Sequence, residues 1–219
     1  MSALPSPMPR RRGPAAPDRA VVHRILDAGR VAHVAFSVRA RPLVAPMLYV
    51  REGDSLLLHG SLGGRLLQAM GGGASACVSV ALVDGLVLAR SHAGHAMNYR
   101  AVVAYGRASA IVDAGDKAAA LARLVDALAP GRAHESRAAD AAELQATALL
   151  RFSIEEASAQ GRSGPPCDAP ADLASPAWAG VLPLRAACDR AVPAPGVQAQ
   201  APLPNSLRRL LGSMPAAWT

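Results

Sequence analysis

Short apolar runs separated by turn residues dominate the first two thirds of the chain. Turn clusters such as Glu52-Gly53-Asp54 and Asp84-Gly85 lie between runs rich in Val, Leu and Ala. Runs of this length bounded by turn chemistry indicate antiparallel strands, and Asp-Gly is a strong hairpin signal. The pattern predicts strands over 31–38, 43–50, 55–59, 76–82, 86–91, 99–112 (with a bend at Gly106) and 147–155.

Helical spacing of apolar residues is confined to a few segments. The helix predicted over 17–29 has Asp18 at its start and Gly29 at its end, both typical of helix termini. Further helices are predicted over 61–70, 117–129, 140–145 and 206–211. Because strands and helices do not alternate, we expect a mainly β (α+β) fold, a small antiparallel β-barrel with flanking helices, and not a doubly wound parallel sheet.

Pro- and Ala-rich ends flank the patterned region. We expect a disordered leader over 1–16, one domain over 17–185 and an Ala/Pro-rich tail over 186–219. The Gly/Pro-rich stretch 161–176 is predicted to be a loop inside the domain.

Composition narrows the classes of protein. The 219 residues are 51% hydrophobic, which is enough to bury a core. No apolar stretch approaches the roughly 18 residues that a membrane span needs, so we expect no membrane partner. The net charge is +7, but Arg10, Arg11, Arg12, Arg208 and Arg209 in the two ends supply most of the excess. A nucleic-acid surface needs clustered charge on a folded face, so we expect no nucleic-acid partner.

Cysteine usage bears on the compartment. Cys77, Cys167 and Cys188 are odd in number and widely spaced, which indicates neither a disulfide framework nor a zinc site. The leader has basic residues with no apolar run after them, so it fits no secretion signal. We expect a cytoplasmic protein.

A first candidate site lies where the strand over 55–59 ends. His59-Gly60-Ser61 leads into the predicted helix, which carries Arg65. Helix starts bind phosphate through free N–H groups, and an arginine can grip a phosphate with two hydrogen bonds. The alternative is that Ser61 only caps the helix and Arg65 is only a solvated residue.

A second candidate is the polar segment 91–100. It brings His92, His95, Asn98, Tyr99 and Arg100 together. Two histidines with no carboxylate or cysteine are a weak metal motif, so we expect no metal site. The alternative is an ordinary polar loop between strands.

Two apolar segments are further candidates. Pro46 stands within the strand that continues through Met47, Leu48 and Tyr49. Proline in a strand indicates an edge with unpaired backbone groups, which can hydrogen-bond a flat heterocycle; an ordinary edge strand is the alternative. Trp178 begins the segment 178–184 and covers either a ligand, a partner subunit or one end of the barrel.

No catalytic nucleophile is visible in the chain. There is no nucleophile elbow and no paired-carboxylate signature. This fits a protein whose chemistry belongs to a cofactor.

Several of these segments, in order along the chain, resemble one known family. The segments 84–91 and 95–108, together with Leu58-His59-Gly60-Ser61 and Arg65, 154–159 and 178–184, are similar to the pyridoxamine 5′-phosphate oxidase-like family of flavin-nucleotide-binding proteins. The nitroimidazole-resistance reductases resemble a related branch. The similarity covers about residues 17–185.

The resemblance implies a fold, a cofactor and an assembly. It implies the FMN-binding split barrel, a six-stranded antiparallel barrel, and a homodimer with FMN in a cleft built from both subunits. Ser61 and Arg65 would hold the FMN phosphate, and Pro46, Met47, Leu48 and Tyr49 would line the flavin, largely through backbone. His95, Asn98, Tyr99 and Arg100 would lie near the cofactor or the dimer interface, and Trp178 would close the site.

The function that follows is an FMN-binding oxidoreductase with an unknown small-molecule substrate. The alternative is a non-catalytic carrier of flavin, deazaflavin F420 or haem, since split-barrel relatives include deazaflavin and haem binders. The scattered His23, His33 and His59 give no clear haem ligand.

Overall fold

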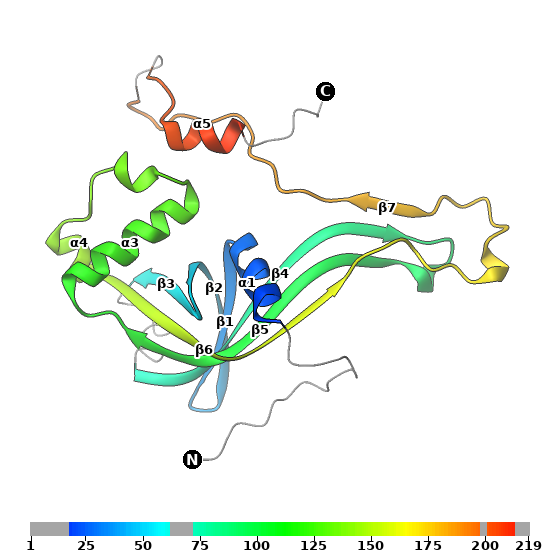
Figure 1. The fold of residues 1–219 in the computed structure, drawn as a ribbon, viewed down its shortest axis with the longest axis horizontal. Coiled ribbons are helices and arrows are strands. Elements are labelled where there is room, and N and C mark those ends of the chain that lie inside the picture. Colours follow the sequence, from blue (N-terminus) through cyan, green and yellow to red (C-terminus); the bar gives the residue numbers. More distant parts are fainter. Residues whose placement is uncertain (1–17, 62–71, 198–200, 213–219) are drawn as a thin grey trace.

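One antiparallel sheet forms the body of the protein (Figure 1). The computed structural model describes residues 18–61, 72–197 and 201–212. The strands run in the order β1-β2-β3-β6-β5-β4-β7, and a further pairing of β1 with β4 closes six of them into a ring. Their bounds are β1 (Val31–Val38), β2 (Arg41–Glu52), β3 (Ser55–Ser61), β4 (Gly72–Leu88), β5 (Ala96–Ala110), β6 (Thr147–Arg162) and β7 (Gly180–Pro183). The predicted split-barrel architecture is confirmed.

The core lies inside the ring, and helix α1 (Arg19–Ala28) covers it. Asp18 caps this helix by accepting a hydrogen bond from Ala20 N at 2.9 Å, as expected for an N-cap aspartate. Val22, Ile25 and Leu26 are buried against strand side chains such as Phe152. Alternate residues of each strand face this core, which is why the apolar pattern has period two.

A second apolar cluster lies outside the ring. Leu57 and Leu149, on the paired strands β3 and β6, pack against Ala120 and Leu124 of α3 (Ala114–Leu128). The short helix α4 (Ala141–Ala146) begins at Asp140, which forms a capping box with Glu143. Both helices were predicted from the sequence at nearly these bounds.

The prediction of a hairpin at Asp84-Gly85 is wrong. β4 runs unbroken from Gly72 to Leu88, and these two residues form an irregularity in its pairing with β5. Asp84 is the extra residue and turns its carboxylate to Arg100. Glycine suits this position because a Cβ would lie 3.1 Å from Leu182 O on β7, closer than an ordinary van der Waals contact. The dipeptide therefore makes a bulge, and the strand continues.

Beyond the ring the strands extend into a long projection, which we call the arm: residues 83–100 together with 160–184. Figure 1 shows β4 and β5 running out past the ring with β7 beside them. β7 pairs with β4 from Gly85↔Pro183 to Leu88↔Gly180. The short 3-10 turn η1 (His92–Gly94) connects β4 to β5 at the far end.

The ends of the chain meet the predictions in part. The predicted C-terminal helix is α5 (Asn205–Gly212), whose buried Ser206 donates to Glu135 through its N–H (3.1 Å) and its hydroxyl (2.5 Å). The leader and the helix predicted over 61–70 lie outside the described residues, except for Ser61, which ends β3. In the parts of the chain that the structure describes, no helix is long and apolar enough to cross a membrane.

Candidate functional site

The described residues among those predicted to form the site fall into two groups, one on the ring and one on the arm. Pro46, Met47, Leu48, Tyr49 and Ser61 belong to the ring, on β2 and β3. His95, Asn98, Tyr99, Arg100 and Trp178 belong to the arm. Each group has its own geometry.

The ring group lies where the barrel opens between β2 and β3. β3 pairs with β2 only from Ser55 to Leu58, whereas β2 continues along β1 as far back as Arg41. Within the described residues, the edge of β2 over 41–48 that faces away from β1 therefore has no strand partner. Pro46 lies on this part of the strand, opposite His33 of β1. Unpaired backbone groups of this kind can hydrogen-bond the polar rim of a flat ring system.

The Tyr49 side chain points into the core and not into this opening. Its exposed fraction is 2%, and its hydroxyl donates to Leu26 O of α1 at 2.5 Å. Burial raises the pKa of the Tyr49 phenol well above its usual value, and the nearby Asp27 charge acts in the same direction. Any contact of Tyr49 with a cofactor is thus left to its backbone.

The predicted phosphate-binding pair lies at the limit of what the structure describes. The backbone of Ser61 ends β3 opposite Thr147 of β6. Arg65 lies outside the described residues. Their part in holding a phosphate stays a prediction.

In the arm, Asn98 is the centre of a polar network. Its exposed fraction is 9%, so its amide needs partners. Asn98 Nδ2 donates to Gly164 O at 3.1 Å, and Asn98 Oδ1 accepts from Arg162 at 2.8 Å. Arg162 also donates to Pro165 O at 3.2 Å. The network fixes the loop after β6 against β5.

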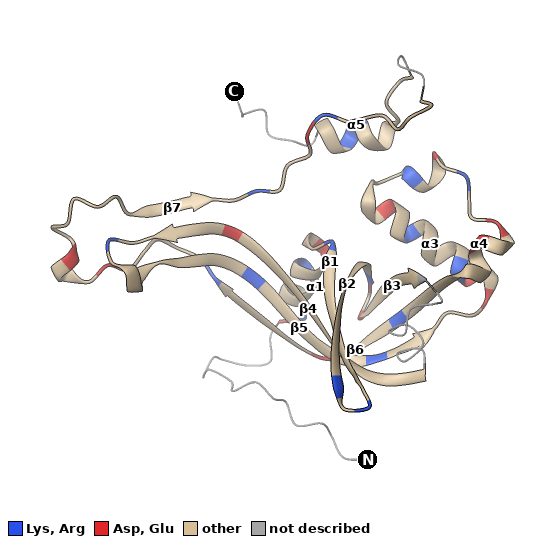
Figure 2. Cartoon of the chain, turned by 180° about the vertical axis from the view of Figure 1, so that it is seen from behind, with Lys and Arg blue, Asp and Glu red and all other residues tan. Residues whose placement is uncertain are grey.

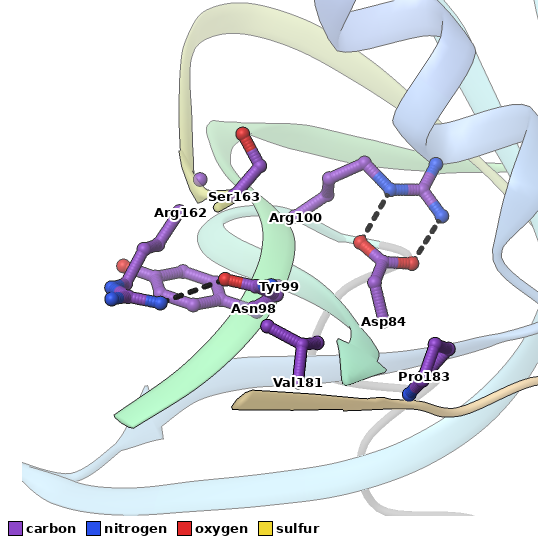
Figure 3. A pocket seen from close by; sticks show the side chains of 9 residues that line it. Asp84, Asn98, Tyr99, Arg100, Arg162, Ser163, Val181 and Pro183 are labelled. Atoms are coloured by element: carbon purple, nitrogen blue, oxygen red, sulfur yellow. Dashed lines mark hydrogen bonds and ion pairs between the residues drawn. The ribbon is translucent and has the colours of Figure 1, made fainter. Parts of the chain in front are cut away.

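Arg100 lies next to this network and is neutralised. Its guanidinium donates twice to the Asp84 carboxylate, at 2.8 and 2.7 Å. These charge-assisted hydrogen bonds hold the pKa of Asp84 below its usual value. Arg100 was predicted to contact the cofactor or the dimer interface, and within this chain its partner is Asp84 (Figure 3).

A hollow of about 410 Å³ opens between these side chains (Figure 3). It brings together residues from β4, β5, the end of β6 and β7. The lining residues are Asp84, Asn98, Tyr99, Arg100, Gly161, Arg162, Ser163, Val181 and Pro183.

Arg162 and Ser163 were missed from the sequence. The end of β6 was predicted near Glu155, because the residues that follow are Ala, Ser, Gln and Gly with little alternation. The observed strand runs to Arg162 and pairs it with Tyr99. The only signal in the sequence was an arginine beside glycines in a loop of low charge.

His95 is held by its Nδ1 atom, which lies 2.9 Å from Ser91 O. Because a carbonyl oxygen only accepts, Nδ1 carries a proton, and Nε2 of the neutral ring keeps a lone pair. This is the arrangement in which an imidazole binds a metal. Among the described residues, no group of three His, Cys, Asp or Glu side chains could hold a metal ion.

Large apolar side chains near His95 are exposed on one face of the arm. Leu86 pairs with Met97 on β5 and with Leu182 on β7, so the three point to the same side. Met97 and Leu182 are each 52% exposed, and Trp178 is 66% exposed over Gly180. We call Leu86, Met97, Trp178 and Leu182 the apolar face of the arm. Exposed patches of this kind mark binding surfaces.

Positive and negative charges are interspersed over the described part of the chain. Figure 2 shows Lys and Arg interspersed with Asp and Glu along the described elements. Several arginines are paired, for example Arg51 with Asp27 and Arg90 with Asp168.

Comparison with protein families gives one match. Residues 18–160 match the family model described as pyridoxamine 5′-phosphate oxidase. A comparison with curated proteins found no match.

The solved structures similar to this chain include two relatives of nearly full length. The flavocytochrome Anf3 from Azotobacter vinelandii is 40% identical, with a TM-score of 0.80, covering 88% of this chain and 90% of its own. The FAD and heme binding protein from Mycobacterium smegmatis is 37% identical, with a TM-score of 0.83, covering 88% and 95%. A candidate 5-nitroimidazole resistance protein from Bacteroides thetaiotaomicron is 18% identical, with a TM-score of 0.54 over 65% and 83%, and supports the fold alone.

Proposed function

The chain belongs to the pyridoxamine 5′-phosphate oxidase family, and from this premise we propose that it is a redox protein that binds both a flavin and a haem. The observation that carries the proposal is the similarity, over 88% of the chain, to a flavocytochrome and to an FAD and heme binding protein. A flavin supplies two-electron chemistry and a haem supplies one-electron chemistry. The proposed activity is therefore electron transfer between a partner that exchanges two electrons and a partner that exchanges one.

The flavin site is proposed at the opening between β2 and β3. The unpartnered backbone of 41–48 fits the donors and acceptors on the rim of an isoalloxazine ring. Ser61 and Arg65 are proposed to hold its phosphate, as the family resemblance implies. We propose FAD and not FMN, because the Mycobacterium smegmatis relative is an FAD binder.

The haem site is proposed on the arm. His95 presents an Nε2 lone pair because Nδ1 is bound to Ser91 O, and the apolar face of the arm offers a surface for a flat apolar ring. His95 directly precedes Ala96, whose partner on β4 is Val87; the next residue, Leu88, pairs with Gly180 beneath Trp178. The imidazole and the indole therefore lie next to β5 and β7, the two strands that flank β4.

A homodimer is part of the proposal. The arm projects away from the ring (Figure 1), so the two groups of predicted site residues meet only if another copy of the chain supplies one of them. We propose that the arm of one subunit covers the opening between β2 and β3 of its partner.

The decisive experiment is to purify the full chain and record its absorption spectrum. A flavin spectrum together with a Soret band supports the proposal, and heating followed by chromatography of the released nucleotide distinguishes FAD from FMN. A protein that takes up neither added FAD nor added FMN contradicts the flavin assignment. A flavin spectrum with no uptake of added haem contradicts the haem assignment alone.

A second measurement tests the proposed haem ligand. His95→Ala should lose the Soret band of reconstituted protein, whereas His92→Ala, in the same turn, should keep it. An equal loss in both variants, or in neither, contradicts the assignment of His95.

Electron transfer from the reduced flavin separates an enzyme from a carrier. If reduced flavin passes electrons to the haem or to oxygen, the protein is a redox enzyme; if it does not, the carrier alternative holds.

A further inference from the structure

The hollow on the arm holds three charged side chains, and two of them cancel. Asp84 and Arg100 form two hydrogen bonds with each other, at 2.8 and 2.7 Å. The opposite charges of a carboxylate and a guanidinium paired in this way largely cancel, so the pair adds little net charge to the hollow. The charge of the hollow is therefore set by Arg162.

Arg162 has only neutral partners. It donates to Asn98 Oδ1 at 2.8 Å and to Pro165 O at 3.2 Å. None of the ion pairs between described residues includes Arg162, in contrast to Arg51, Arg90 and Arg100. A guanidinium has five N–H donors, so three remain for another acceptor. The hollow carries an uncompensated positive charge.

The guanidinium is also held in place before any ligand arrives. Asn98 is buried and is itself anchored to Gly164 O at 3.1 Å. Asn98 and Pro165 therefore fix Arg162 from two sides. A fixed guanidinium loses little conformational freedom on binding, which favours recognition over a freely moving surface arginine.

The rest of the lining defines the kind of ligand. Ser163 adds a hydroxyl next to Arg162, while Tyr99, Val181 and Pro183 form largely apolar walls. The volume of about 410 Å³ is within the range of small-molecule sites. We propose that this hollow binds a carboxylate or phosphate group carried on a small apolar body, with Arg162 as the residue that pairs with the anion.

Two sources of such an anion are compatible with the chemistry. One is the pair of carboxylates on a haem bound to the apolar face, an alternative that rests on the proposed function. Val181 and Pro183 point to the opposite side of β7 from Leu182, so these carboxylates would have to reach the hollow past the edge of β7. The other is a separate small organic anion. The site itself requires neither flavin nor haem, so it is tested independently of them.

The first test measures anion binding to the full chain by calorimetry, with benzoate and inorganic phosphate as probes at low salt. Arg162→Gln should weaken binding by about tenfold or more, the typical effect of losing a charge-assisted hydrogen bond. Arg107→Gln is the matched control, since it removes one arginine of β5 that lies far from the hollow and is paired with Glu155. Arg162→Lys keeps the positive charge but lacks the planar set of N–H donors of a guanidinium, and should bind with intermediate affinity.

The second test identifies the source with haem and its dimethyl ester, which lacks the two carboxylates. Preference of wild type for haem, lost in Arg162→Gln, assigns the anion to the cofactor. Benzoate binding with no such preference assigns it to a separate ligand. The proposal is overturned if wild type binds neither probe and does not distinguish haem from its ester. It is also overturned if Arg162→Gln and Arg107→Gln behave alike. Should Arg162→Gln fail to fold, unchanged affinity in Arg162→Lys and Ser163→Ala would overturn it equally.

Discussion

At the scale of single residues, Tyr49 shows how one residue can serve the core and border a binding site. Its strand borders the opening between β2 and β3, while its phenol is buried and donates to Leu26 O at 2.5 Å. That hydrogen bond joins the ring to the helix that covers it. Gly29 permits the contact, because a Cβ at this position would lie 2.5 Å from the Tyr49 hydroxyl oxygen.

Replacing Tyr49 by Phe should therefore affect stability and leave cofactor binding unchanged. The substitution leaves Leu26 O buried without its donor, at a cost of about 1–3 kcal/mol in the free energy of unfolding. Urea denaturation of the wild type and the variant measures this cost, and fluorescence titration with FAD measures affinity. A variant that keeps its stability and loses FAD affinity would place the hydroxyl at the cofactor.

At the scale of elements, the sequence was sufficient wherever local patterns decide the structure. The strands over 31–38 and 55–59 and the helices over 17–29 and 117–129 follow from alternation, spacing and caps such as Asp18. The sequence predicted that the first two strands are separated by residues 39–42, and a turn is found there. Its residues Arg39 and Ala40 adopt positive φ angles of 49° and 63°, which glycine or asparagine adopts more readily.

Tertiary pairing decided what the sequence could not show. Asp84-Gly85 has the composition of a hairpin turn, but a bulge suits it once Arg100 and β7 lie alongside. Arg162 reaches the candidate site only through its pairing with Tyr99, across more than sixty residues of chain. No local pattern encodes either contact, because both depend on which strands become neighbours.

Within the arm, the Arg90–Asp168 ion pair attaches the loop over 161–176 to the segment that follows β4, in addition to the hydrogen bonds at Gly164 and Pro165. The Asp168 carboxylate accepts from Arg90 N at 2.8 Å and from the Arg90 guanidinium at 2.5 Å, with its side chain only 4% exposed. The hydrogen bonds from Arg90, first from its backbone N–H, hold the pKa of Asp168 below its usual value. The attachment therefore needs the charged carboxylate.

Acid should release this loop. A depressed pKa in the folded state means that the pair stabilises fully above the usual aspartate pKa, and that this is lost as pH falls through the depressed value. Hydrogen exchange over 161–176, expressed relative to the intrinsic rate of an unprotected amide at each pH, should therefore rise on acidification in the wild type. Asp168→Asn should exchange several-fold faster already at neutral pH and show little further acid dependence, while Asp172→Asn, in the same loop, should follow the wild type. Equal exchange in all three proteins would contradict this role.

At the scale of the whole molecule, two parts of the chain extend beyond the ring: the arm and the segment that follows β7. The arm carries the apolar face away from the ring, and the segment after β7 returns to α5, which Glu135 anchors through Ser206 (Figure 1). The apolar face and the opening of the barrel are thus separate surfaces of one chain. In the proposed dimer both surfaces are covered, because the arm of each subunit packs over the opening of the other.

Charge placed on the apolar face tests the dimer. Leu182→Glu and Met97→Glu each put a carboxylate where the proposed interface excludes water, and burying an unpaired charge is strongly unfavourable. The dimer dissociation constant should rise by about tenfold or more, measured by light scattering across a dilution series. Val192→Glu is the matched control, since Val192 is highly exposed and lies in the segment between β7 and α5. If the two arm variants form the same dimer as this control, the arm does not cover a partner; if they are monomeric and also lose flavin, the flavin site depends on both subunits.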